Sequence, residues 1–178
     1  MRKGFLALAI IPLLALSGCV DLAQYTQFNM DYQSRVVIPS SSGLNLPFNV
    51  FTPDVESNAE ATFQVNDTRK DLIEEIQLTE LGLTLTTPSN SDFSFLKSIE
   101  IFLEAEGLSE IRVAWNTEVP ENVGSTLDLE TTTVDLKEYI KKDSFSLRVN
   151  TVTDEALLSD HEIDIDALFY VDAEILGQ

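Results

Sequence analysis

The sequence predicts an all-β protein: an antiparallel β-sandwich of eight or nine strands, immunoglobulin-like or jelly-roll, with one or two short helical connections. Apolar and polar residues alternate in many short stretches, which is the period of a strand with one buried face. Turn-forming residues separate these stretches at short intervals, as in all-β sandwiches. Each stretch has one polar face, as expected for a sheet that packs on a second sheet with one side only.

The N-terminal half of the chain is expected to supply several short strands. Alternation predicts them over residues 28–32, 35–38, 44–50 and 61–65. Pro47 lies inside the third of these stretches. Because proline has no N–H to donate, we expect that strand at a sheet edge or at a bulge.

A long strand is predicted over residues 72–86, with an irregularity in its middle. The apolar residues before Thr79 and those after Glu80 fall on opposite faces of a regular strand. One extra residue at this point, a β-bulge close to Gly82, brings both sets of side chains onto the same face.

Residues 97–106 and 111–115 are expected to form an antiparallel hairpin. Both stretches alternate cleanly, and Gly107 separates them. Trp115 is in phase with the apolar residues of its own stretch. We therefore expect its ring in the core.

Three further strands are predicted in the C-terminal part of the chain. They cover residues 127–129, 145–149 and 163–171. Asp135 is placed to cap a helix of one or two turns before the second of these strands. Residues 153–159 are expected to form the other short helical connection.

The N-terminus has the layout of a secretory signal peptide. Arg2 and Lys3 precede an apolar run over residues 5–16, which is too short to cross a membrane. The run ends in Leu16-Ser17-Gly18-Cys19, and this tetrapeptide resembles the lipobox of bacterial lipoproteins. The resemblance implies cleavage before Cys19 and a diacylglycerol on its thiol. With a second acyl chain, such an anchor holds a protein on a membrane permanently.

This resemblance divides the chain into three parts. Residues 1–18 are expected to be the signal peptide, 19–33 the lipidated N-terminus and tether, and 34–178 the β-sandwich. The lipoprotein sorting rule retains proteins with Asp directly after the cysteine at the inner membrane. Because Val20 stands there instead, we expect a palmitate-bearing lipoprotein of the outer membrane, on its periplasmic face or at the cell surface.

The chain is strongly acidic. Its formal net charge is −19, and removal of Arg2 and Lys3 with the signal peptide makes it −21. Nucleic acids are therefore not expected as partners, because phosphate binding needs clustered basic residues. Cys19 is the sole cysteine, so the mature domain forms no internal disulfide.

A row of carboxylates near the C-terminus is the first candidate site. At the two-residue period of a strand, Asp160, Glu162, Asp164 and Asp166 project from one face. They are candidates for binding a hard cation such as calcium, which prefers oxygen ligands, although a solvated acidic face is the simpler interpretation. His161 falls on the apolar phase of the same stretch and is expected at the margin of the core.

Exposed aromatic residues are the second candidate site. Phe102 lies on the polar face of its strand, and Tyr170 lies beside the acidic row. Together with Tyr32 they are candidates for stacking against a ligand. No nucleophile motif or phosphate-binding loop occurs in the sequence, so neither catalysis nor a cofactor is expected.

Three functions remain open, in descending order. The first is a non-enzymatic envelope lipoprotein that binds or supports an envelope protein or glycan. The second is a surface glycan-binding module, if the three aromatic residues share one face. The third is a hydrolase that uses two carboxylates in a cleft.

Overall fold

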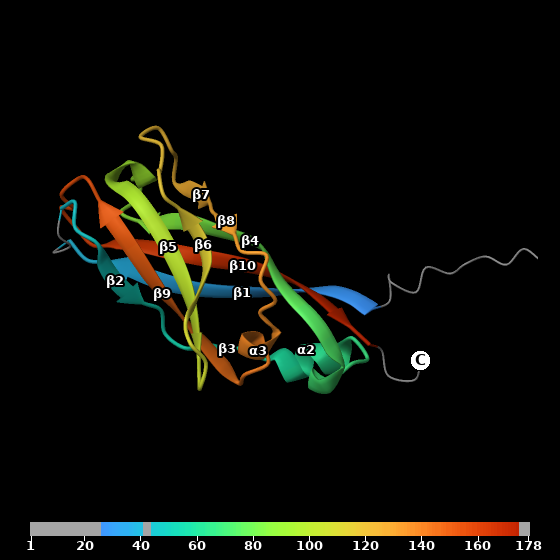
Figure 1. The fold of residues 1–178 in the computed structure, drawn as a ribbon. Helices are drawn as coiled ribbons and strands as arrows, with labels where there is room; N and C mark the ends of the chain where they lie inside the picture. Colours follow the sequence, from blue (N-terminus) through green and yellow to red (C-terminus); the bar gives the residue numbers. More distant parts are fainter. Residues whose placement is uncertain (1–25, 41–43, 175–178) are drawn as a thin grey trace, which may run out of the picture.

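The computed structural model describes residues 26–40 and 44–174, and these form two antiparallel sheets packed face to face (Figure 1). The predicted β-sandwich is therefore confirmed, with ten strands instead of eight or nine. The strands are β1 Gln27–Ile38, β2 Phe48–Phe51, β3 Val55–Glu56, β4 Ile73–Thr87, β5 Leu96–Ala105, β6 Ile111–Asn116, β7 Thr126–Asp128, β8 Glu130–Thr131, β9 Ser144–Thr153 and β10 His161–Ala173. The helical segments are α2 Ala59–Val65, α3 Lys137–Ile140 and the 3₁₀ turns η1 Lys70–Leu72 and η2 Phe93–Phe95.

The smaller sheet has the order β1-β10-β4-β7, and the larger sheet has the order β2-β9-β5-β6-β8, with β3 also paired to β9. The first and last strands pair along their whole length, from Gln27 opposite Asp172 to Ile38 opposite His161. Strands β5 and β6 form the predicted hairpin. Residues far apart in the sequence thus meet in the middle of each sheet.

The predicted bulge in β4 is confirmed. Glu80 pairs with Leu168 and Leu78 pairs with Phe169, so Thr79 is the extra residue. Leu78 and Leu81 are both buried as a result. Alternating apolar residues from both sheets fill the space between the layers, and the largest fully buried ones include Ile76, Leu83, Ile99, Ile101, Leu103 and Ile163.

The strand predicted over residues 61–65 is wrong, because this segment lies in helix α2. Ala59 and Phe63 are four residues apart, share one helix face and are buried, whereas Val65 is 82% exposed. A strand would have put Phe63 and Val65 on the same side. The helical period decided this segment.

Two other connections also differ from expectation. Residues 153–159 form no helix and belong to the end of β9 and the turn before β10. The predicted strand over 127–129 is divided: β7 pairs with β4 in the smaller sheet, and β8 pairs with β6 in the larger one. The one-turn helix after Asp135 is present as α3.

The second predicted strand is shorter than expected. Only Phe48–Phe51 of residues 44–50 and beyond forms β2, and Leu44 and Leu46 are exposed. Strand β2 lies at the edge of its sheet, as Pro47 predicts.

The sandwich begins earlier than the expected boundary at residue 34. Strand β1 starts at Gln27 and joins the stretches 28–32 and 35–38 into one strand, so part of the expected tether 19–33 belongs to the fold. The signal peptide 1–18 and Cys19 lie outside the described residues. No helix within the described ranges is both long and apolar enough to cross a membrane.

Candidate functional site

The outer face of the larger sheet carries a residue that the sequence analysis misplaced. Ala114 pairs with Ile101 and Arg112 pairs with Phe102, so Val113 is an extra residue in β6. Val113 and Ala114 are consequently both buried. The bulge turns Trp115 to the outer face, and the expectation that Trp115 lies in the core is wrong.

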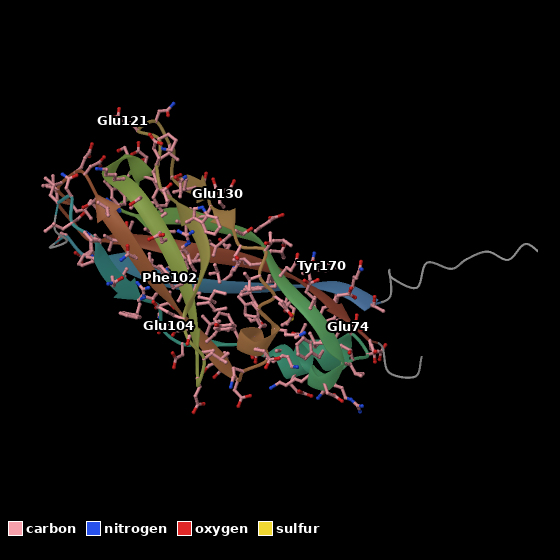
Figure 2. The ribbon with its side chains drawn as sticks, viewed as in Figure 1. Glu74, Phe102, Glu104, Glu121, Glu130 and Tyr170 are labelled. Carbon is pink, nitrogen blue, oxygen red and sulfur yellow. The ribbon has the colours of Figure 1, made fainter. Side chains whose placement is uncertain are left out.

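Two rows of side chains run across this outer face. In one row, the paired positions are Phe51, Arg148, Phe102 and Arg112, which come from β2, β9, β5 and β6. In the next row they are Asn49, Asn150, Glu100, Trp115 and Glu130. We call these nine residues the arginine–aromatic face. Figure 2 shows Phe102 on β5 and Glu130 on β8 at this face.

Arg148 is the best-held side chain of the arginine–aromatic face. Its guanidinium lies 4.0 Å from the centre of the Phe102 ring. Its Nε and Nη2 donate to the two carboxylate oxygens of Glu110 at 2.8 and 2.9 Å, and its Nη1 donates to Asn49 Oδ1 at 2.6 Å. The hydrogen bond with Glu110 raises the pKa of Arg148 and lowers the pKa of Glu110.

Arg112 and Trp115 form a second stack of the same kind. The Arg112 guanidinium lies 4.4 Å from the centre of the Trp115 ring and contacts Glu100 Oε1 at 2.6 Å. The indole N–H of Trp115 donates to Glu130 Oε2 at 2.8 Å. Both aromatic rings therefore have a guanidinium over one face, where a sugar ring would otherwise stack.

The three aromatic residues proposed for ligand stacking do not share a surface. Phe102 is on the outer face of the larger sheet, whereas Tyr170 is on the outer face of the smaller sheet, between Asn29 and Gln77. Tyr32 points inward, and its hydroxyl donates to the Ser57 carbonyl. The predicted common patch does not form.

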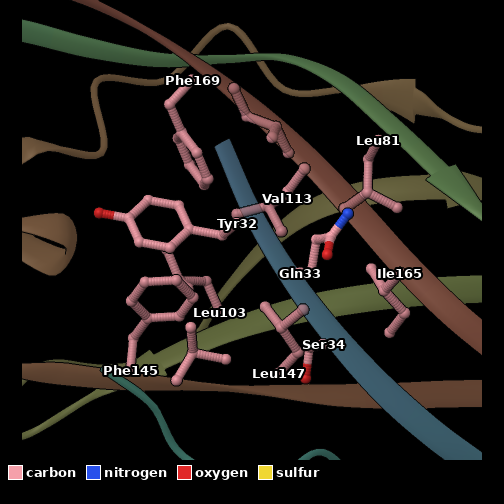
Figure 3. Close-up of a pocket in the computed structure, with 13 residues that line it drawn as sticks. Tyr32, Gln33, Ser34, Leu81, Leu103, Val113, Phe145, Leu147, Ile165 and Phe169 are labelled. Atoms are coloured by element: carbon pink, nitrogen blue, oxygen red, sulfur yellow. The ribbon is translucent and has the colours of Figure 1, made fainter. Parts of the chain in front are cut away.

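Tyr32 lies in an apolar gap between the sheets (Figure 3). Its ring packs edge-on against Phe145 and Phe169 at 5.2 and 5.6 Å, and burial raises the pKa of its hydroxyl. The remaining cavity measures about 10 Å³. This is room for about one water molecule, so the gap is a packing feature and no ligand site.

The acidic row has partners on the neighbouring strand. Glu162, Asp164 and Asp166 do share one face of β10, but Arg35 of β1 contacts Asp164 at 2.6 Å and Glu162 at 3.4 Å. Gln33 of the same strand donates to Asp166 at 2.8 Å. Asp160, the fourth member of the row, accepts a hydrogen bond from the backbone of Ser40.

This arrangement favours a solvated acidic face over a cation site. Within the described part of the chain, no three His, Cys, Asp or Glu side chains converge as metal ligands. The side chains of a strand are spaced along it and do not meet at one point, and here β1 supplies a counter-ion instead. His161 is buried at the margin of the core, as expected, with its ring 4.6 Å from that of Phe95.

The carboxyl groups show no preparation for acid catalysis. Every described carboxyl group whose pKa clearly departs from its usual range is shifted downward, namely Asp92, Glu110, Asp135 and Asp160. The general acid of a glycoside hydrolase needs a raised pKa. The carboxylate hydrolase interpretation therefore gains no support from the resolved shifts.

The comparisons with known proteins assign no family. No family model matches the chain, and no curated protein matches it. Among solved structures, a chain of Desmodium yellow mottle tymovirus is similar at a TM-score of 0.26 and 10% identity, with 100% of this chain and 96% of that chain covered. A chain of mud crab dicistrovirus gives 0.33 and 12%, covering 99% and 83%, and one of tomato aspermy virus gives 0.29 and 10%, covering 83% and 80%. These resemblances are loose, and no function follows from them.

Proposed function

We propose that this protein is a bacterial envelope lipoprotein, anchored to the outer membrane through acylated Cys19. Its β-sandwich is non-enzymatic and binds another envelope protein through the arginine–aromatic face. The lipobox at residues 16–19 supports the anchor. The observation that carries the binding function is the pair of arginine–aromatic stacks on one outer sheet face.

The composition of this face suits a protein interface. Arginine, tryptophan and other aromatic residues are enriched among the residues that contribute most to protein binding. Arg148 is held at once by a ring, a carboxylate and an amide, and its side chain is 15% exposed. Side chains that are already ordered lose little entropy on binding, which favours affinity.

The charges of this face indicate a basic partner. Four carboxylates surround the two guanidiniums, from Glu100, Glu104, Glu110 and Glu130. The whole mature chain is strongly negative as well. A partner with a basic surface would therefore be steered toward the face and matched by it.

The anchor is tested by intact-mass analysis of detergent-extracted protein beside a Cys19→Ala variant. We expect a wild-type mass that lacks residues 1–18 and includes a diacylglyceryl group. We expect neither change in the variant. An unmodified wild-type protein in the soluble fraction would contradict the anchor.

The binding face is tested by site-specific photo-crosslinking in intact cells. A photoreactive amino acid at Phe51, which is 58% exposed at the edge of the face, should yield a defined crosslinked protein. The same residue at Tyr170, on the opposite outer face, is the matched control and should yield none. Trp115→Ala should abolish the crosslink from position 51. Equal crosslinking from both faces would overturn the proposal.

A surface glycan is the second candidate ligand for the same face. Asn49 and Asn150 lie in one row with Trp115 and offer amide groups to sugar hydroxyls. A sugar stacking on the guanidinium-covered side of Trp115 would first have to displace Arg112. If the glycan is the ligand, Arg112→Ala should strengthen binding, whereas a protein partner should bind Arg112→Ala more weakly.

A further inference from the structure

The end of the sandwich away from Gln27 contains a polar cleft. Ile38 and His161 pair at this end, and Gln27 and Asp172 pair at the other, where β1 begins (Figure 1). The cleft lies between the segment around η2 and the turn that precedes β10. Its volume is about 390 Å³, which is within the usual range for small-molecule sites.

His161 contributes the most enclosed polar group of this cleft. The residue is 7% exposed, and its ring packs against Phe95. Its Nδ1 lies 2.9 Å from the carbonyl oxygen of Ser159. Because a carbonyl oxygen can only accept, Nδ1 carries the proton, and Nε2 of the neutral ring is a hydrogen-bond acceptor.

Nε2 of His161 is open to the cleft. It has no hydrogen-bond partner among the described residues, and the ring lines the cleft. No fully buried side-chain nitrogen or oxygen within the described ranges lacks a partner, so Nε2 is not sealed inside the protein. A nine-tenths buried imidazole thus presents a free acceptor to the cleft.

The other polar groups of the cleft are hydroxyls, an amide and carboxylates. Ser91, Ser94, Ser159, Asn90, Asp92 and Glu155 line it, and these lining residues include no lysine or arginine. The set is rich in acceptors. It suits a ligand with several O–H donors and does not suit an anion.

Apolar side chains form the rest of the wall. Leu157 is buried beneath the cleft, and Leu158 is 99% exposed beside it. Pro88 lines it as well. An apolar wall together with a few directed polar groups is the usual composition of a small-ligand site.

We propose that this cleft binds a neutral saccharide unit, with a sugar hydroxyl donating to His161 Nε2 and the C–H face of the ring against Leu158. A sugar hydroxyl both donates and accepts, which matches the serine hydroxyls and the asparagine amide. A hydrated cation gains little from the leucine wall, and no metal-ligand cluster is present among the described residues. This site is separate from the arginine–aromatic face and does not depend on the function proposed for that face.

The test is calorimetric titration of the detergent-solubilised mature protein with neutral oligosaccharides built from glucose, galactose, mannose, xylose or N-acetylglucosamine. We expect at least one series to bind. His161→Asn should weaken that binding tenfold or more, because the shorter amide can still donate to Ser159 but offers nothing at the position of Nε2.

Two further variants keep the test independent of folding. Leu158→Ser changes a side chain without packing contacts and should also weaken binding at least tenfold. Val65→Ser changes a similarly exposed residue on α2 and should leave binding unchanged. The proposal is overturned if no series binds, if binding ignores both cleft variants, or if spermidine binds in place of the sugars.

Discussion

Tyr32 shows how one hydroxyl links the two sheets of this sandwich. The residue belongs to β1 of the smaller sheet, yet it donates to the carbonyl of Ser57, which follows β3 of the larger sheet. Its ring meanwhile packs against Phe145 and Phe169, one from each sheet. The side chain is thus an aromatic core residue with one directed polar contact.

We expect Tyr32→Phe to lower the free energy of unfolding by about 1 kcal/mol, because the buried carbonyl of Ser57 loses its donor while the ring packing is kept. Urea unfolding at neutral pH measures the difference. Tyr170→Phe is the matched control and should change stability little, because Tyr170 lies on an outer sheet face. Equal effects of the two changes would show that the Ser57 contact contributes nothing.

Asp135 connects α3 to the smaller sheet. Its Oδ1 accepts from the backbone N–H of Ile76 at 3.1 Å and from that of Lys137 at 3.0 Å. Burial raises the pKa of Asp135, but these two hydrogen bonds, together with the Lys137 ammonium, lower it further, so the net shift is downward. The ionised form is therefore favoured in the folded protein.

A lowered pKa in the folded state gives stability that is present above the unfolded-state pKa and lost as the pH falls through the folded-state value. At neutral pH we expect Asp135→Ala to be less stable by on the order of 1 kcal/mol. This difference should shrink below about pH 4 as the wild-type carboxylate becomes protonated. Urea unfolding across the acidic range measures it, and a difference that grew on acidification would contradict the assignment.

At the scale of elements, α2 shows why a period of two can mislead. Residues 61–65 alternate apolar and polar types, yet Ala59 and Phe63 set the buried face of a helix. The two patterns share Phe63 and differ in what they require of Val65. The exposed Val65 belongs to the helical one.

The two residues should respond differently to truncation. Phe63→Ala should cost about 3–5 kcal/mol, because Phe63 is fully buried and its removal leaves a cavity. Val65→Ala should change stability by less than about 0.5 kcal/mol, because it removes only exposed atoms. Chemical unfolding of both variants beside wild type tests this contrast. A large cost for Val65→Ala would mean that α2 packs through its other face.

The elements that the sequence predicted well are those that form long, regular strands. Strands β5, β9 and β10 follow from alternation alone, and the bulge at Thr79 follows from the change of phase around it. The bulge in β6 was missed, although Val113 and Ala114 are two consecutive apolar residues in an otherwise alternating stretch. That signal was sufficient to place Trp115 outside.

The candidate sites were less predictable than the strands, because strand order determines them. The acidic row of β10 was placed correctly on one face, but only the pairing with β1 brings Arg35 beside Asp164. Likewise, Arg148 meets Phe102 and Asn49 because β9 lies between β2 and β5. Sequence alternation gives the face of a side chain, whereas its neighbours depend on topology.

At the scale of the whole molecule, repulsion between carboxylates opposes the fold. The chain carries 30 acidic residues against 11 basic ones, and signal-peptide removal increases the imbalance. At about 0.15 M ionic strength the screening length is roughly 8 Å, so repulsion across the surface is largely removed. We expect the melting temperature to rise when sodium chloride is raised from about 0.01 M to this level.

Scanning calorimetry of the mature protein in the two salt concentrations measures this effect. Potassium fluoride should act as sodium chloride does, because the cause is general screening and not binding of one ion. A melting temperature that fell with salt would mean that the ion pairs of Arg35, Arg112 and Arg148 outweigh the repulsion.

The full-length pairing of β1 with β10 has a mechanical consequence for an anchored protein. A pull from the membrane enters at the start of β1, and a partner holding the far end of the sandwich pulls the other way. The load then runs parallel to the twelve-residue strand β1 and reaches its ladder with β10 in shear. All the rungs of that ladder must yield together, whereas a strand loaded from the side would open one rung at a time. The position of β1 beside the last strand thus makes the attachment point of the domain resistant to force.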